Sequence, residues 1–258
     1  VGEDPTLHYY RNNETHQALI GGQGELHIKT LVNKMKDKFG IEVSLDDLKV
    51  PYRETIKGSS DVEGKHKKQS GGHGQYGHVK IRFSRSESEF DFSEELFGGS
   101  VPKSYVPAVE KGLRDSMLKG VLAGYPVTNI KAVLYDGSYH DVDSSEMAFK
   151  MAASMAFKDA MKKGNAVLLE PIFAVEVVTP DDYMGDVMGD LNSRRGMIQG
   201  MEERNGAQVV RAHVPLSEMF GYSTDLRSTT QGRATYTMIF DHYAQVPGSV
   251  AKKITEGK

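Results

Sequence analysis

The clearest hydrophobic pattern lies in the last third of the chain, where strand-like and helix-like segments alternate. An apolar, β-branched run at 172–178 predicts a strand, and apolar residues at helical spacing over 184–191 predict a helix. Two further strands, at 196–201 and 207–214, are expected around Asn205-Gly206, a dipeptide favoured in tight hairpin turns. A short helix after Pro215 and an alternating strand at 234–240 follow. The order βαββαβ is that of the split-βαβ, or ferredoxin-like, fold.

The first 45 residues predict part of a second unit of the same kind. Strands are expected at 7–10 and 17–20, followed by a helix with an apolar stripe from Ile28 to Phe39 and by a strand at 41–45. The order ββαβ lacks the first strand and helix of a complete unit. We therefore expect the chain, which starts at Val1 rather than Met, to begin inside a domain and to leave part of that domain's sheet and helix packing exposed.

The middle of the chain follows a different pattern. Strands are expected at 77–84 and 127–135, and helices at 107–121 and 144–163. Apolar residues surround the second helix broadly, which predicts that it is well buried: Met147, Phe149, Met151, Met155, Phe157 and Met161. The whole chain is thus expected to be a multidomain α+β protein.

Composition excludes several classes of protein. The absence of cysteine excludes disulfides and thiolate metal sites. No apolar run approaches the ~20 residues of a membrane-spanning helix. The net charge of −3 argues against a uniformly basic nucleic-acid binder, but a basic stretch from Lys57 to Arg85 precedes an acidic one from Glu87 to Glu95. No phosphate-binding loop of the form G-x-x-x-x-G-K-[ST] is present.

The glycine-rich stretch 70–77 is the first candidate site. Gly72–Gly77 fits G-x-G-x-x-G, but an alternating strand-like segment follows it, and a dinucleotide site needs a helix there. Two interpretations remain open. In one, the loop contacts RNA through backbone N–H groups, with Tyr76 stacking on a base and nearby lysines attracting phosphate. In the other, it is a hairpin loop whose Tyr76 packs inward.

Two further stretches carry candidate chemistry. His140 with Asp141 and Asp143 suggests metal binding or acid–base catalysis; an EF-hand is excluded because Glu146 stands where that loop needs glycine. Asp143 and Glu146 fit a capping box at a helix start, which leaves His140 unexplained. Arg194-Arg195 lies at the end of a predicted helix, where cations either complement the helix dipole or contact phosphate.

Several long motifs, in the same order, resemble bacterial elongation factor G. They are Gly22–His27, Tyr52–Thr55, Ser70–Val79, Gly137–Glu146, Leu191–Gly200, Val214–Gly232 and Phe240–Tyr243. The resemblance implies part of a ferredoxin-like domain III (1–57), a domain IV like the second domain of ribosomal protein S5 (58–168), a ferredoxin-like domain V (169–246) and a terminal helix or tail (247–258). It implies that this part of the protein is no enzyme and holds no cofactor or metal, since GTP and Mg²⁺ belong to a GTPase domain that the matched motifs do not include.

The resemblance also implies partners and sites. We expect a cytoplasmic, monomeric protein that binds no membrane and acts on the ribosome, tRNA and mRNA during GTP-dependent translocation. Lys65, Lys67 and Lys68 are expected to face RNA, and Arg194 and Arg195 to contact large-subunit rRNA near the GTPase-associated centre and the sarcin–ricin loop. The tip expected in the small-subunit decoding region consists of Ser70, Gly71, Gly72, His73, Gly74, Gln75, Tyr76, Gly77, Ser138, Tyr139, His140 and Asp141.

Three positions depart from the family pattern. His73 stands where arginine is common, Lys80 where an apolar or aromatic residue is usual, and Gln23 where methionine is usual. The departures keep open a specialised paralogue or a ribosomal-protection protein without full translocase activity. A more remote alternative from another class is a metal-assisted RNA hydrolase that uses His140, Asp141 and Asp143.

Overall fold

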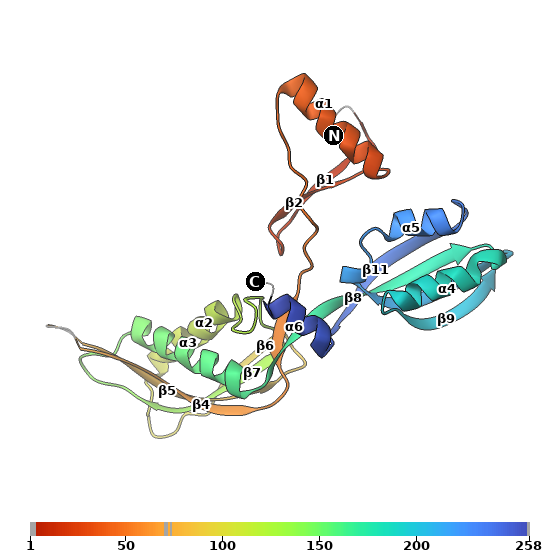
Figure 1. Cartoon of the computed structure of the whole chain (residues 1–258). Helices are drawn as coiled ribbons and strands as arrows, with labels where there is room; N and C mark the ends of the chain where they lie inside the picture. The colour runs from red at the N-terminus through yellow and green to blue at the C-terminus, as the bar shows by residue number, and fades with distance from the viewer. Residues whose placement is uncertain (1–3, 70–71, 73, 257–258) are drawn as a thin grey trace. The chain divides into compact units, whose positions relative to one another are not determined.

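The computed structural model describes residues 4–69, 72 and 74–256, which form a multidomain α+β architecture as the sequence predicts (Figure 1). The chain divides into two compact units. One takes the chain up to Pro51 together with Glu170–Tyr243, and the other takes Tyr52–Leu169 together with the chain from Ala244. Within the described residues, no helix has both the length and the apolar character needed to cross a membrane.

The N-terminal segment consists of one hairpin and one helix. β1 (His8–Asn12) pairs antiparallel with β2 (Gln17–Gly21), and α1 (Glu25–Phe39) ends at Gly40 in the left-handed conformation. α1 buries none of its residues fully, and an apolar cavity of about 650 Å³ lies between the helix and the hairpin. The apolar stripe of α1 is therefore only partly covered by this segment.

The strand expected at 41–45 is wrong. Residues 40–52 form neither helix nor strand. A strand needs a neighbour that shares its backbone hydrogen bonds, and no described strand pairs with this segment. A side chain takes that role instead: the amide of Gln17 donates to the carbonyl oxygen of Asp47 at 2.8 Å and accepts from the N–H of Lys49 at 2.9 Å.

Residues from 166 to 245 confirm the predicted βαββαβ order. The elements are β8 (Ala166–Thr179), α4 (Met184–Ser193), β9 (Met197–Arg204), β10 (Ala207–Pro215), α5 (Tyr222–Thr229) and β11 (Thr235–Gln245). The strand order is β11-β8-β10-β9, with β10 antiparallel to both neighbours. Asn205 and Gly206 both have positive φ, as a tight hairpin turn between β9 and β10 requires. Apolar side chains of α4 and α5 pack on one face of this sheet.

The second unit is built on a four-stranded sheet. Its strands are β4 (Ser60–Lys68), β5 (Gln75–Arg85), β6 (Phe90–Glu94) and β7 (Ile130–Ser138), in the order β4-β5-β7-β6, and only the β6–β7 pair is parallel. β3 (Arg53–Ile56) pairs with the first residues of β8, and α6 (Gly248–Glu256) follows near the end of the chain. α2 (Val106–Met117) and α3 (Glu146–Lys163) cover one face of the sheet, and the core of the unit lies between these layers (Figure 1).

Close packing of α3 on this sheet depends on small residues. The buried side of α3 carries five alanines together with two phenylalanines and Met161. Opposite them, a Cβ added at Gly64 would lie 2.0 Å from the carbonyl oxygen of Ala152, and one added at Gly77 would lie 2.3 Å from that of Ala148. Only glycine permits such an approach of strand to helix backbone.

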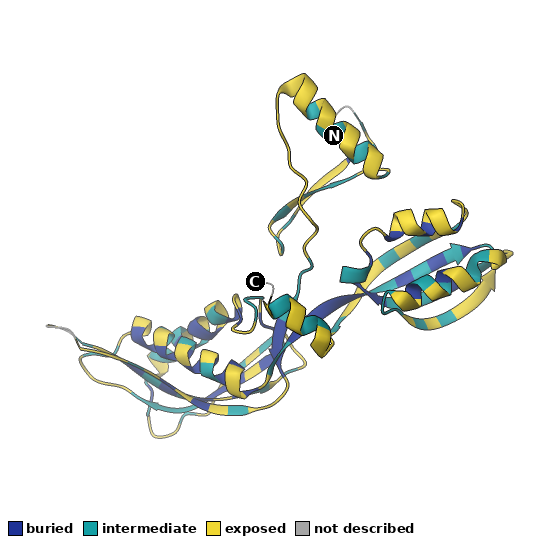
Figure 2. Cartoon of the chain, in the orientation of Figure 1, coloured by how far each residue is buried: buried dark blue, intermediate teal, exposed yellow. Residues whose placement is uncertain are grey.

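α3 is well buried along one side only, so the predicted burial is wrong for three of its methionines. Met147, Met151 and Met155 are 61%, 43% and 46% exposed and follow one another at four-residue spacing. Figure 2 shows buried and exposed positions alternating along this helix. The apolar count of the helix is high because alanines fill its inner side and methionines occupy part of its outer side. Periodicity that counts both residue types as core does not separate these two faces.

Candidate nucleic-acid interface

Two loops of the second unit project from the same end of its sheet. The β4–β5 hairpin pairs Lys68 with Gln75 next to its turn. β5 is also antiparallel to β7, and His78 pairs with Ser138 at the same end of the sheet. The described residues 74–77 of the first candidate stretch thus lie beside the loop after Ser138. The sheet order therefore brings them together with the second stretch, 138–146, which the sequence singles out separately.

Hydrogen bonds lock the two loops to each other. The carboxylate of Asp143 accepts from the N–H of Gly74 at 3.0 Å, and its carbonyl oxygen accepts from the N–H of Tyr76 at 2.8 Å. The hydroxyl of Ser144 donates to the carbonyl oxygen of Tyr76 at 2.9 Å. These contacts are partly buried. They include a parallel bridge between Tyr76 and Ser144, so the second loop runs beside the hairpin like a short additional strand.

The predicted capping role of Asp143 is wrong. The residue that caps α3 is Ser145, whose hydroxyl accepts from the N–H of Ala148 at 3.1 Å. Asp143 lies two residues earlier, outside the helix, and its acceptor oxygens serve the hairpin instead. A short polar side chain satisfies either a helix end or a neighbouring loop, and tertiary contact decides between them here.

The glycines of the hairpin differ in what surrounds them. Gly77 is buried beneath α3, and a Cβ at Gly74 would lie 2.8 Å from the carboxylate of Asp143. Gly72 is exposed and has positive φ. Three members of the expected tip, Ser70, Gly71 and His73, lie outside the described residues. Of the described glycines, Gly74 and Gly77 thus fit close packing, and Gly72 fits a turn.

Tyr76 lies on the open face of the sheet, opposite the side on which Gly77 is buried under α3, and its side chain is partly buried there. Its hydroxyl lies 2.7 Å from that of Ser138, which lies 2.7 Å from Nδ1 of His78. Burial is the main cause that lowers the pKa of His78, so its imidazole is neutral at pH 7. The Tyr76 ring is therefore held by side chains of its own sheet on the open face and does not enter the core beneath α3. His78, which is not among the expected tip residues, takes part in this network.

His140 is the residue of the second loop best placed to meet a partner. Its side chain is 55% exposed, and its Nδ1 accepts from the N–H groups of Val142 and Asp143 at 3.3 and 3.2 Å. An accepting Nδ1 leaves the proton on Nε2 in the neutral ring, so the outer nitrogen is a donor. Tyr139 and Val142 are also exposed, by 46% and 65%, and so is the polar side chain of Asp141. Val142 is not among the tip residues expected from the sequence, because a single valine in a polar loop gives no periodic signal.

Positive charge follows β4 toward the hairpin turn. Lys65, Lys67 and Lys68 are exposed. Gly64 is buried under α3, so the alternation of a strand directs Lys65 and Lys67 to the opposite, open face of the sheet. Nζ of Lys65 lies 5.8 Å from the centre of the Tyr76 ring. The open face near the tip is therefore cationic and lined by an aromatic ring.

Lys80, the unusual residue of β5, has a specific partner. Its Nζ lies 2.9 Å from a carboxylate oxygen of Asp136 on β7. The hydrogen bond from Lys80 is the main cause that lowers the pKa of Asp136. A lysine at this position is accommodated as one half of a cross-strand ion pair.

Arg194 and Arg195 are held by partners in their own part of the chain. Arg194 donates to the carboxylates of Asp190 and Asp225 and to the carbonyl oxygen of Glu218. Arg195 forms a two-pronged pair with the buried Glu170, at 2.8 and 2.9 Å, and also donates to the carboxylate of Glu218. These contacts fix the end of α4. Contact of either arginine with rRNA stays a prediction.

The residues proposed for metal-assisted hydrolysis do not assemble a metal site. Nδ1 of His140 lies 3.7 Å from a carboxylate oxygen of Asp143, but the described part of the chain brings no third histidine or carboxylate to them within metal-binding range. Both groups are also occupied by the loop contacts described above. The geometry supports a contact surface here rather than a hydrolytic centre.

Three protein families match successive parts of the chain. Residues 1–47 match elongation factor G domain III, residues 48–165 match elongation factor G domain IV, and residues 167–254 match the elongation factor G C-terminus. The chain is also similar to a crystal structure of a protein from Thermus thermophilus, with 47% sequence identity and a TM-score of 0.89. That match covers 99% of this chain and 38% of the Thermus chain. The described fold and the three consecutive matches together show that the chain belongs to the elongation factor G family of translation factors, as a part that contains domain IV, the C-terminal domain and a segment of domain III.

Proposed function

We propose that the interlocked hairpin and loop at the end of the second unit form an RNA-contacting tip. In this proposal the tip enters the small-subunit decoding region and holds tRNA and mRNA while a longer parent protein drives their GTP-dependent movement. The observation that carries the proposal is the pairing of Asp143 and Ser144 with Gly74 and Tyr76. Because the loops are fixed to each other, a force that acts on either loop reaches the sheet through both loops.

The chemistry of the surface supports RNA as the partner. Lysine charge along the open face of β4 attracts phosphates without regard to sequence. The exposed imidazole of His140 offers a directional N–H donor together with a flat ring. The matched elongation factor G domains support ribosome binding in general. Contacts of the C-terminal domain with the GTPase-associated centre and the sarcin–ricin loop belong to the same proposal.

The decisive variant is His140→Ala in the full-length parent. We expect translocation of tRNA and mRNA to slow by about tenfold, the effect of losing one hydrogen bond of roughly 1.4 kcal/mol in the rate-limiting state. GTP hydrolysis on the ribosome should persist, because the variant leaves the GTPase domain intact. His140→Gln, which retains a side-chain N–H donor, should restore part of the rate.

Two outcomes would count against the tip. Equal loss of translocation and GTP hydrolysis would mean that His140 supports folding or general binding. An unchanged translocation rate would remove the loop from the contact surface. As a separate check on charge, replacing Lys65 and Lys67 with glutamine should lower the salt dependence of ribosome binding, by about one unit of logarithmic slope for each phosphate that no longer binds a lysine.

A further inference from the structure

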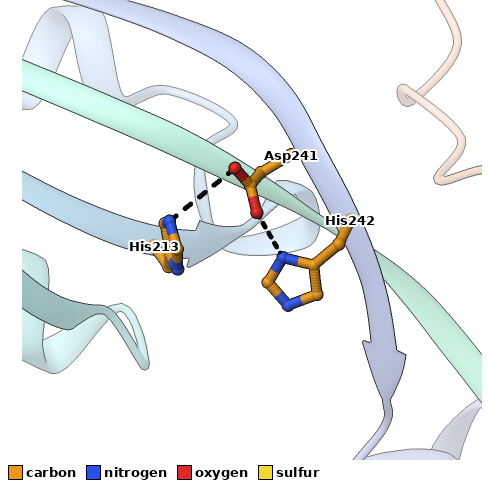
Figure 3. A group of neighbouring side chains, drawn as sticks. All are labelled: His213, Asp241 and His242. Atoms are coloured by element: carbon orange, nitrogen blue, oxygen red, sulfur yellow. Dashed lines mark hydrogen bonds and ion pairs between the residues drawn. The ribbon is translucent and has the colours of Figure 1, made fainter.

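Three potential metal-binding atoms from β10 and β11 come together in the sheet formed by residues 170–243. Figure 3 shows Asp241 between two histidine rings, with one carboxylate oxygen directed at each. Its Oδ2 lies 2.5 Å from Nδ1 of His242, and its Oδ1 lies 3.9 Å from Nε2 of His213. All three donor atoms lie within 4.8 Å of one another.

The sheet order explains why these side chains meet. His213 is on β10, and Asp241 and His242 are on β11, with β8 between the two strands. Strands on either side of a third are about 10 Å apart, so their side chains meet only if the middle strand leaves space above it. The residue of β8 in register with His213 is Ala174. Residues opposite each other share a face, so only a methyl group lies beneath the gap.

The surroundings favour an ion over a simple charge cluster. Arg211 lies two residues before His213 on the same face of β10, but its guanidinium is paired with Glu176 and Glu202. Its charge is therefore largely offset. Asp241 and His242 are 41% and 48% exposed, which leaves room for water as a further ligand.

We propose that His213, Asp241 and His242 bind a divalent transition-metal ion of the Zn²⁺ type. Two imidazole nitrogens and one carboxylate oxygen form a donor set that suits such ions, with the remaining position open to solvent. Bonds of about 2.0–2.2 Å place neighbouring ligand atoms roughly 3.3 Å apart. The observed spacings reach that value by small side-chain rotations, since the shorter one must widen and the longer one must close. The ion would join β10 to the edge strand β11 across β8.

The test is zinc binding by the untagged 258-residue chain, measured by isothermal titration calorimetry with ZnSO₄. We expect one equivalent to bind, and we expect His213→Ala, Asp241→Ala and His242→Ala each to weaken that binding by about tenfold or more. Ala174→Leu removes no ligand but fills the gap over β8, and it should weaken binding similarly. His8→Ala, an exposed histidine on β1, is the matched control and should bind zinc as the unmodified chain does.

A second readout separates a bound ion from loss of fold. Titration with Co²⁺ should produce visible d–d absorption in the unmodified chain and in His8→Ala, and not in His213→Ala. Circular dichroism should be the same for all variants, because the three side chains lie at the surface. The absence of stoichiometric zinc binding, or binding that survives both His213→Ala and Asp241→Ala, would overturn the proposal. Equal weakening by His8→Ala would overturn it too.

Discussion

Replacing Gly77 with alanine is expected to destabilise the second unit and to loosen its tip. The added Cβ would lie 2.3 Å from the carbonyl oxygen of Ala148 and 2.8 Å from the amide nitrogen of Phe149, at the start of α3. Ordinary van der Waals contact begins at 3.4 Å, so strand and helix must separate by about 1 Å. Ala148 and Phe149 are themselves fully buried, so the start of α3 has little freedom to move.

The expected cost is about 3 kcal/mol. Overpacking of a closely packed core costs about 1–3 kcal/mol. Lifting α3 also stretches the hydrogen bonds between Tyr76 and residues 143 and 144, each of which contributes about 1 kcal/mol. Against these losses, alanine reduces the entropy of the unfolded chain, by about 0.4–1 kcal/mol in favour of folding. The net effect is clearly destabilising.

The measurement is urea unfolding combined with hydrogen exchange. Because a protein with several domains unfolds in more than one step, exchange is followed by mass spectrometry in peptides that cover 75–80 and 144–150. Both should lose protection in Gly77→Ala. Gly58→Ala is the matched control in the same unit, since its Cβ would lie 3.5 Å from the nearest backbone oxygen. The reasoning fails if Gly77→Ala unfolds within about 0.5 kcal/mol of Gly58→Ala and retains its protection.

Two further predictions concern buried and paired carboxylates of the same unit. Glu54 is fully buried and accepts from the N–H groups of residues 122, 123 and 125. Glu54→Ala should therefore cost roughly 3 kcal/mol in urea unfolding, and Glu54→Gln, which keeps one oxygen, clearly less; equal costs would contradict this. The pKa of Asp136 is lowered mainly by its hydrogen bond with Lys80, so the pair stabilises the fold at neutral pH and the stabilisation is lost as pH falls through that lowered pKa. Asp136→Asn should thus have a lower unfolding temperature at pH 7, with the difference shrinking toward pH 3; a difference independent of pH would refute it.

The elements with strong local signals were predictable from the sequence. The βαββαβ order and the turn at Asn205-Gly206 are confirmed because apolar periodicity and turn chemistry act over a few neighbouring residues. The strand expected at 41–45 failed because a strand depends on a partner elsewhere in the chain, and Gln17 supplies the backbone contacts there. The predicted burial of α3 was wrong for Met147, Met151 and Met155 because alanines occupy most of the inner surface of the helix.

For the candidate site, the sequence identified the two loops but not how they are held together. Asp143 resembles a helix cap, and only the sheet order shows that Gly74 and Tyr76 lie beside it. Likewise, Tyr52–Thr55 stands out as a motif, yet nothing local indicates that Glu54 anchors a loop about 70 residues later. The cluster of His213, Asp241 and His242 was not predictable, because its members come from two strands separated by a third.

The contacts separate two groups of residues in and around the two loops: those that hold the loops in place and those whose side chains are free to meet a partner. Asp143 and Ser138 bind groups of the hairpin, and Gly77 lies against α3, so their loss alters the position of the loops and lowers the stability of the second unit. The side chains of Lys65 and Lys67 and the outer nitrogen of His140 are directed away from the interior, so their loss removes attraction and leaves the fold nearly unchanged. A variant that slows translocation without changing urea unfolding therefore identifies a contact with RNA. A variant that changes both identifies a residue that holds the loops in position. His140→Ala should fall in the first class and Gly77→Ala in the second.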